Sequence, residues 1–207
     1  MTGSTSLIGR GRVCGVLVAT LVAGGFLAQA LAEPFQHSFG ELREYHRHWL
    51  SVCPDTHTPG ADDDYATTCW ATTWTGNPDG SMDGFFPGDR LSVQRNRVTG
   101  ALSITFVSVP VEEVDQDRPV EVRFSSGRIR AFAYGSAVTP NRNSGNEYTF
   151  TNPEDVADLI RCMRAGSHMT ITLPTTGDDA TMQFSLWGLR RAMGFLERYA
   201  DQAGPAG

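Results

Sequence analysis

The sequence predicts a mainly β protein, an antiparallel β-sandwich with two short helices near its C-terminus. Three observations predict this class. Short segments rich in β-branched and aromatic residues recur along the chain, separated by turns rich in glycine, proline and asparagine. Two late segments show helical periodicity. Strands and helices do not alternate regularly, as they would in a parallel α/β fold.

The first 32 residues have the three parts of a secretory signal peptide. Arg10 and Arg12 supply positive charge, residues 13–27 form a short apolar core, and Ala30-Leu31-Ala32 is a typical cleavage site. The core is shorter than the roughly 20 residues that a membrane-spanning helix needs. We therefore expect cleavage after Ala32, a periplasmic location and no membrane span in the mature chain.

Residues 33–207 are expected to form one domain, and its composition limits its chemistry. Loss of the signal peptide changes the formal net charge from −6 to −8, which argues against a nucleic-acid partner because such proteins need a cationic surface. All basic residues are arginines, so lysine-dependent Schiff-base and phosphate-loop chemistry is excluded. Motifs of serine hydrolases and zinc proteases are absent. We expect a non-enzymatic protein without a cofactor.

The first two strands expected in this domain each carry a cysteine. They span residues 49–53 and 65–74, which are rich in β-branched and aromatic residues. Cys53 and Cys69 lie 16 positions apart, and in an oxidising compartment they are the natural disulfide pair. Such a bridge stabilises a fold by about 3 kcal/mol.

Two hairpins are expected in the middle of the chain. The first pairs residues 90–98 with 101–109, and the second pairs 120–124 with 129–134. The segment 101–109 is apolar on both faces, which is typical of a central strand. A short strand over residues 147–151 follows.

The C-terminal third begins with a helix over residues 153–165. Asn152 is expected as its N-cap, and Pro153 suits the first helical position. The remaining expected elements are a hairpin of residues 168–173 and 180–186 and an amphipathic helix over residues 187–201.

Cys162 has no partner left in the mature chain. It lies on the apolar side of the expected helix, which favours a buried free thiol; a reactive or intermolecular thiol is the alternative. His168 is near in sequence, but a catalytic pair requires the histidine to reach the thiol, and Gly166 ends the helix between them. No catalytic residue is therefore expected.

Several segments together suggest a family. They are Trp49-x-x-x-Cys53, Thr68-Cys69-Trp70-Ala71, the helix end at Arg164-Ala-Gly166 and, most specifically, Phe-Ser-Leu-x-Gly-x-x-x-Ala at residues 184–192. In these segments the chain resembles the invasion-associated locus B family of exported periplasmic proteins of Gram-negative bacteria. A second cysteine pair of that family, near residues 135–147, is missing here. The resemblance implies a non-enzymatic exported protein, and none of its motifs is catalytic.

The long loops are the expected binding surface, because a rigid scaffold commonly binds through the loops that it displays. These loops span residues 55–64, 76–88 and 141–146. We expect a protein partner in the periplasm or cell envelope, bound by an interaction or accessory protein. The residues expected to contact it are Phe85, Phe86, Asp62, Asp63 and Asp64.

The alternative is a small-ligand or metal-binding module. His46 and His48 would share one face of an extended segment, with residues 62–64 nearby in sequence. Two histidines can bind zinc, but a tetrahedral site needs further ligands that converge in space. The aromatic residues Tyr65, Trp70 and Trp74 could line a ligand groove, although such side chains more often pack in a core.

Overall fold

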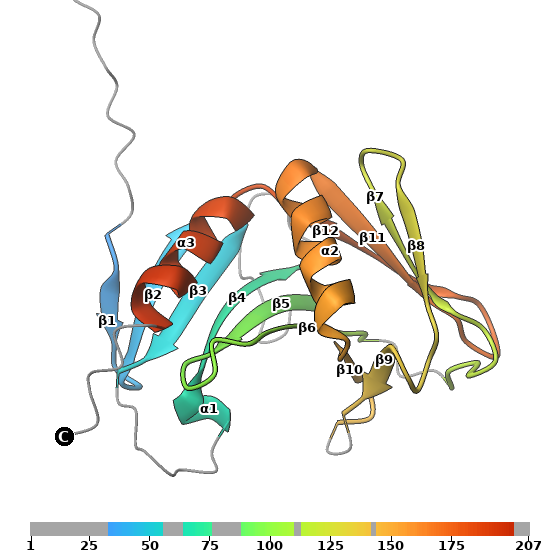
Figure 1. Cartoon of the computed structure of the whole chain (residues 1–207), viewed down its shortest axis with the longest axis horizontal. Helices are drawn as coiled ribbons and strands as arrows, with labels where there is room; N and C mark the ends of the chain where they lie inside the picture. The colour runs from blue at the N-terminus through green and yellow to red at the C-terminus, as the bar shows by residue number, and fades with distance from the viewer. Residues whose placement is uncertain (1–32, 56–63, 76–87, 110–112, 142–143, 201–207) are drawn as a thin grey trace, which may run out of the picture. The chain divides into compact units, whose positions relative to one another are not determined.

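A computed structural model of the chain describes residues 33–55, 64–75, 88–109, 113–141 and 144–200. In this part of the chain, the strands form two antiparallel sheets, with two longer helices near the C-terminus (Figure 1). The predicted class, a mainly β antiparallel sandwich with two late helices, is confirmed.

The larger sheet has eight strands in the order β1-β2-β3-β4-β5-β6-β10-β9. All neighbouring pairs are antiparallel. The strands are β1 (Phe35–His37), β2 (Glu41–His46), β3 (Trp49–Pro54), β4 (Thr68–Trp74), β5 (Arg90–Asn96), β6 (Leu102–Val107), β9 (Val138–Pro140) and β10 (Glu147–Phe150). The apolar β6 lies between β5 and β10, so the prediction of a central strand is correct.

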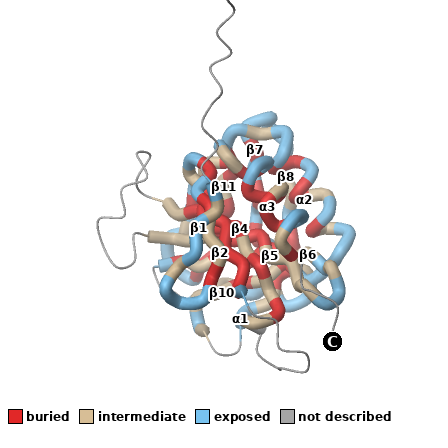
Figure 2. Tube along the Cα trace, turned by 90° about the vertical axis from the view of Figure 1, so that its left-hand side faces the viewer, coloured by how far each residue is buried: buried red, intermediate tan, exposed pale blue. Residues whose placement is uncertain are grey.

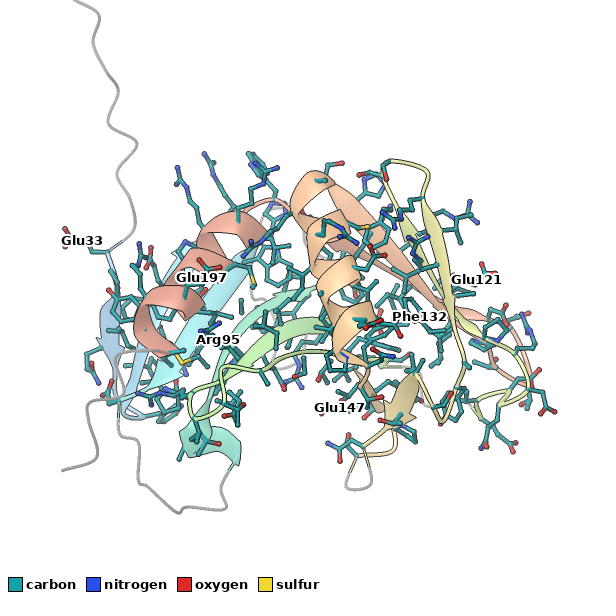
Figure 3. All side chains as sticks on the ribbon, viewed as in Figure 1. Glu33, Arg95, Glu121, Phe132, Glu147 and Glu197 are labelled. Atoms are coloured by element: carbon teal, nitrogen blue, oxygen red, sulfur yellow. A yellow bond between two sulfur atoms is a disulfide. The ribbon has the colours of Figure 1, made fainter. Side chains whose placement is uncertain are left out.

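The smaller sheet has four strands in the order β12-β11-β7-β8, again antiparallel. They are β7 (Val120–Phe124), β8 (Ile129–Phe132), β11 (His168–Leu173) and β12 (Ala180–Ser185). Figure 3 shows Phe132 of β8 among the side chains of the core, and its ring centroid lies 5.0 Å from that of Phe150 on the larger sheet. The two sheets therefore share one core.

The helices are α1 (Asp64–Thr67), α2 (Pro153–Ala165) and α3 (Leu189–Ala200). The side chain of Asn152 caps α2 by accepting hydrogen bonds from the backbone N–H groups of Glu154 and Asp155, at 2.9 and 3.4 Å. The helix α3 begins two residues later than the sequence indicates, because Trp187 and Gly188 form a turn.

One face of the larger sheet, the inner face, is covered by α3 across β2, β3 and β4, while α2 lies against β6 and α3 (Figure 1). The covering elements are tied to β3 by side chains. The indole N–H of Trp49 donates to the carbonyl of Ser185 at 3.0 Å, and the Ser51 hydroxyl donates to the carbonyl of Ala192 at 3.4 Å. Figure 2 shows the resulting core as a buried layer inside exposed loops and helix faces.

The alternation of side chains along β4 determines how α3 packs. Cys69, Ala71 and Thr73 point to the inner face and are buried, whereas their neighbours point to the opposite, outer face. The disulfide predicted between Cys53 and Cys69 is present and joins β3 to β4. Small side chains and a disulfide on the inner face leave room for α3.

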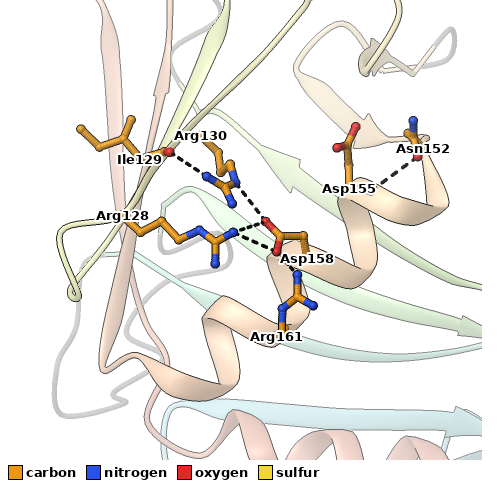
Figure 4. A network of polar contacts seen from close by, with 7 residues as sticks. All are labelled: Arg128, Ile129, Arg130, Asn152, Asp155, Asp158 and Arg161. Atoms are coloured by element: carbon orange, nitrogen blue, oxygen red, sulfur yellow. Dashed lines mark hydrogen bonds and ion pairs between the residues drawn. The ribbon is translucent and has the colours of Figure 1, made fainter.

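A charged network fixes α2 against the smaller sheet (Figure 4). Asp158 on α2 accepts hydrogen bonds from Arg130 Nε at 2.9 Å and from Arg128 Nη2 at 3.1 Å, and it also pairs with Arg161. Hydrogen bonds from Arg161 and Arg130 hold the pKa of Asp158 below its ordinary value. The helix is thus attached to the β7–β8 hairpin.

Some local predictions were wrong. Residues 65–67 are helical in α1 although they were expected to extend a strand, and β1, β2 and β9 were not predicted. The sequences of β1 and β2 are polar and lack a clear alternation of apolar residues. Their strand state is therefore set by pairing, of β1 with β2 and of β2 with β3, rather than by local propensity.

Gly188 allows the start of α3 to contact the β2–β3 hairpin. Its φ is +107°, and a Cβ atom built on it would lie 1.8 Å from the carbonyl oxygen of His46. The adjacent Trp187 accepts a hydrogen bond from the backbone N–H of His48 at 3.3 Å, and the Arg47 guanidinium lies 4.8 Å from the Trp187 ring centroid. No side chain other than hydrogen fits at residue 188 without moving this contact.

We predict that Gly188→Ala destabilises the protein by at least about 2 kcal/mol, because it adds both a backbone clash and conformational strain. Gly194→Ala is the matched control. Gly194 lies within α3 with open space around its Cα, so alanine there should stabilise the fold by about 0.5–1 kcal/mol. Denaturant unfolding of both variants measures the difference, and equal stabilities would contradict the packing described here.

Candidate functional site

The structure separates the two histidines of the predicted metal site. His46 lies on the inner face beneath α3, where its ring centroid is 6.3 Å from that of Phe195. His48 is at the tip of the β2–β3 hairpin, with its ring centroid 5.5 Å from that of Trp187. Among the described residues, no group of three histidine, cysteine, aspartate or glutamate side chains could hold a metal ion.

Most of the residues expected to contact a partner lie outside the described residues. These are Phe85, Phe86, Asp62 and Asp63, so both the loop surface and any contribution of these aspartates to a metal site stay predictions. Asp64 is the first residue of α1.

Cys162 is a buried free thiol on α2. Burial raises the pKa of this thiol, and the nearby carboxylate of Asp158 raises it further. A thiol with a raised pKa is a poor nucleophile, since the thiolate is the reactive form. The structure therefore places Cys162 with the core.

A groove with a volume of about 400 Å³ lies on the outer face of the larger sheet, opposite α3. It crosses four adjacent strands, β2 to β5. We call it the outer groove, and its lining residues are Arg43, Leu50, Val52, Thr68, Trp70, Thr72, Trp74, Arg90, Ser92 and Gln94.

The floor of the outer groove is held by hydrogen bonds. Leu50, Val52, Thr72 and Ser92 are buried although they point to the outer face. The Ser92 hydroxyl donates to the Thr72 hydroxyl oxygen at 3.1 Å, and the Thr72 hydroxyl donates to the carbonyl of Leu91 at 3.2 Å. Hydrogen bonds thus connect the floor of the groove between β4 and β5.

Two tryptophans form the walls of the outer groove. Trp70 and Trp74 are half-buried and flank Thr72 on β4, so their Cα atoms are about 13 Å apart at the usual strand rise. Gln94 lies beside Trp70 on the neighbouring strand, and Arg90 lies beside Trp74. Each aromatic ring thus has a polar side chain next to it.

A second hollow, of about 450 Å³, shares Thr68 and Gln94 with the outer groove. We call it the polar hollow because hydroxyl and amide groups dominate its lining. The Ser103 hydroxyl donates to Gln94 Oε1 at 3.2 Å. The other lining residues are Asn96, Ala101, Leu102, Thr105, Asn141, Glu147 and Thr149.

Ion pairs offset the charges around both hollows. Arg43 pairs with Glu41 on its own strand, and Arg90 Nη2 lies 3.6 Å from Glu147 Oε2 across the sheet. The described residues of the two linings include neither histidine nor cysteine. The arrangement can bind an uncharged molecule through flat apolar surfaces and hydrogen bonds.

Part of this site can be predicted from the sequence. The segment Thr68-Cys-Trp-Ala-Thr-Thr-Trp74 is rich in β-branched and aromatic residues, and Trp70 and Trp74 are the candidate groove residues that it contains. Partners from β2, β3 and β5 could not be identified, because they are brought together only by strand order and register.

A buried charged cluster lies on the inner face between β2 and α3. Glu44 Oε1 is 3.5 Å from His46 Nδ1, and Glu44 Oε2 is 3.4 Å from Arg198 Nη2. Burial lowers the pKa of His46 to about 4, helped by the charges of Arg198 and Arg191. Burial raises the pKa of Glu44, against the opposing effect of the same arginines. His46 is therefore neutral at pH 7, and its buried Nε2 has no hydrogen-bond partner among the residues that the structure describes.

We predict that His46 makes the protein less stable in mild acid. The unfolded chain binds a proton at this residue below about pH 6.5, while the folded chain does so only near pH 4, so the free energy of unfolding falls across that range. In His46→Phe this part of the pH dependence should disappear. Between pH 6.5 and pH 4 the free energy of unfolding of this variant should fall by about 1–3 kcal/mol less than that of the parent protein. Urea unfolding at a series of pH values tests this. The exposed His168→Phe is the control, and an unchanged pH dependence in His46→Phe would contradict a neutral buried imidazole.

Comparisons with known proteins identify no relative. A scan of protein-family models, a search of curated proteins and a search of solved structures each gave no match. The family suggested by the sequence therefore stays a prediction, and the function has to be argued from the site itself.

Proposed function

We propose that this chain is an exported, non-catalytic binding protein whose binding surface is the outer groove. The observation that carries the proposal is the combination of Trp70, Trp74 and a hydrogen-bonded floor in a groove on the sheet face opposite α3. Ligand sites are typically concave, with aromatic walls and a few fixed polar groups. The groove has each of these properties.

Export is supported by the N-terminal sequence and by the disulfide. Residues 1–32 have the order of charge, apolar core and small residues that signal peptides share. A Cys53–Cys69 bridge suits an oxidising compartment such as the periplasm. None of the described helices is long and apolar enough to cross a membrane.

A non-catalytic role is supported by the chemistry of the groove. Its hydroxyl groups at Thr72 and Ser92 bond to each other or to backbone, and none of the described lining residues is a histidine that could activate them. The resemblance to the invasion-associated locus B family supports the same class of protein. We propose a ligand or partner in the periplasm or cell envelope.

The location of the groove on strands favours selective binding. Each of β2 to β5 is hydrogen-bonded to a strand on both sides, so the lining side chains extend from a fixed backbone. Sites on regular elements are held more accurately than sites on loops, and less entropy is lost when a ligand binds. The groove is therefore a stronger candidate than the loops expected from the sequence.

We predict that the exported protein begins at Glu33 and is oxidised at one cysteine pair. The full chain is expressed in a Gram-negative host, and the periplasmic fraction is examined by intact-mass and peptide mass spectrometry. The expected result is a chain without residues 1–32 that contains the Cys53–Cys69 bridge and a reduced Cys162. A chain that keeps Met1 and stays in the cytoplasm would contradict export.

We predict that photo-crosslinking in cells yields adducts from the outer groove. A photoreactive phenylalanine analogue replaces Gln94 or Trp74 in the groove, and Trp187 on the α3 side serves as the control because it is 59% exposed. Discrete adducts from both groove positions, and none from residue 187, are the expected result. Adducts that are equal at the three positions, or confined to residue 187, would refute binding in the groove.

A further inference from the structure

We infer that the outer groove and the polar hollow together bind a neutral oligosaccharide chain. This inference rests on the proposed function and names the ligand class for the same surface. Four properties carry it: the aromatic walls, the mixture of hydrogen-bonding groups, the balance of charge and the extent of the surface.

The aromatic walls fit the faces of sugar rings. A pyranose ring has faces formed by C–H groups and an edge of hydroxyl groups, so it packs flat on an indole while its edge binds polar side chains. Trp70 and Trp74 provide two such indoles on one strand. Gln94 and Arg90 lie beside them on β5, where they can reach the hydroxyl edge of a stacked ring.

The hydrogen-bonding groups also match a ligand rich in hydroxyl groups. The polar hollow is lined by amides of Gln94, Asn96 and Asn141 and by hydroxyls of Ser103 and Thr149. Gln94 Oε1, Asn96 Oδ1 and the Thr149 hydroxyl already make hydrogen bonds within the chain, so a ligand would use the remaining donors and acceptors of these groups. Amide and hydroxyl groups both donate and accept hydrogen bonds. Together they can therefore bind neighbouring sugar hydroxyls, each of which also donates and accepts hydrogen bonds. A purely apolar ligand would displace water from these groups without replacing its hydrogen bonds, which costs free energy.

The balance of charge argues for a neutral ligand. The arginines of the lining, Arg43 and Arg90, are paired with Glu41 and Glu147, so neither adds an uncompensated positive charge. The mature chain has a formal net charge of −8, which opposes the approach of a polyanion. A nucleic acid or an acidic polysaccharide is therefore disfavoured.

The extent of the surface indicates a chain rather than a single sugar. The two hollows, of about 400 and 450 Å³, each reach the size of an ordinary small-ligand site, and they adjoin at Thr68 and Gln94. They run across the strands from β2 to β10. A linear ligand could therefore contact the tryptophans with one part and the amides with another.

An extended peptide fits this surface less well. Peptides that bind to sheets usually add a strand at an edge and gain main-chain hydrogen bonds. The outer groove lies in the middle of the sheet, where the backbone groups of β3, β4 and β5 are already paired with neighbouring strands. Only side chains are offered to the ligand.

The test is a binding screen of the oxidised mature protein. Because the chain has no lysine, an amine-reactive tag attaches only at the N-terminus and leaves the groove unmodified. The probes are neutral hexasaccharides of glucose, mannose, galactose and N-acetylglucosamine, with a hexasaccharide of uronic acid as the anionic comparison. Binding is measured by calorimetry in solution and by the retention of each probe on protein that is immobilised through its N-terminal tag.

We expect at least one neutral hexasaccharide to bind and to bind more tightly than the uronic-acid probe. Trp74→Ala and, independently, Gln94→Ala should each weaken binding by about tenfold or more, since central aromatic and polar contacts carry most of the affinity at such sites. Trp187→Ala should leave it unchanged. Trp74→Phe tests stacking in a milder variant, and melting curves show that each variant is folded.

The other outcomes separate the two proposals. If no neutral probe binds, or if the groove variants bind as well as the parent protein, the oligosaccharide inference is overturned. It is also overturned by stronger binding of the uronic-acid probe. In these cases groove-specific crosslinks in cells would still support the proposed function, and their absence would overturn both.

Discussion

The close approach of α3 to the strands β2, β3 and β4 is the constraint on which the rest of the structure depends. It requires small side chains on the inner face of β4, at Cys69 and Ala71, and a glycine at residue 188 where the chain turns into the helix. Because the inner face is used for the core, the alternate residues of the same strand, Trp70 and Trp74, must point to the other face. The packing that stabilises the fold thus also creates the outer groove.

This division of the sheet provides the physical basis of the proposed binding without catalysis. The floor of the groove is buried and hydrogen-bonded, and the walls carry large side chains from strands fixed on both sides. Such a surface is preorganised, so little ordering is required when a ligand arrives. The titratable groups with strongly perturbed environments, Glu44 and His46, lie on the inner face beneath α3 and away from the groove. Their role is in packing and in the dependence of stability on pH.

The sequence predicted the class of fold, the helix α2 and the disulfide because each depends on local features. Asn152 and Pro153 determine the start of α2, and Cys53 and Cys69 lie on two neighbouring strands, 16 positions apart in the sequence. The groove depends on the register of strands from β2 to β5, and no local pattern encodes that register. His46 and His48 do not share one strand face as expected, because a hairpin turn follows His46.

The most direct test of the central claim, that the outer face of the sheet binds a neutral oligosaccharide, is the NMR spectrum of the four tryptophan indole N–H groups during titration with neutral hexasaccharides. Each tryptophan reports on a different place: Trp70 and Trp74 on the groove, Trp49 on the core and Trp187 on the start of α3. Binding in the groove predicts that the signals of Trp70 and Trp74 shift with saturation while that of Trp187 stays in place. A shift confined to Trp187, or no shift of either groove signal at saturating ligand, would contradict it.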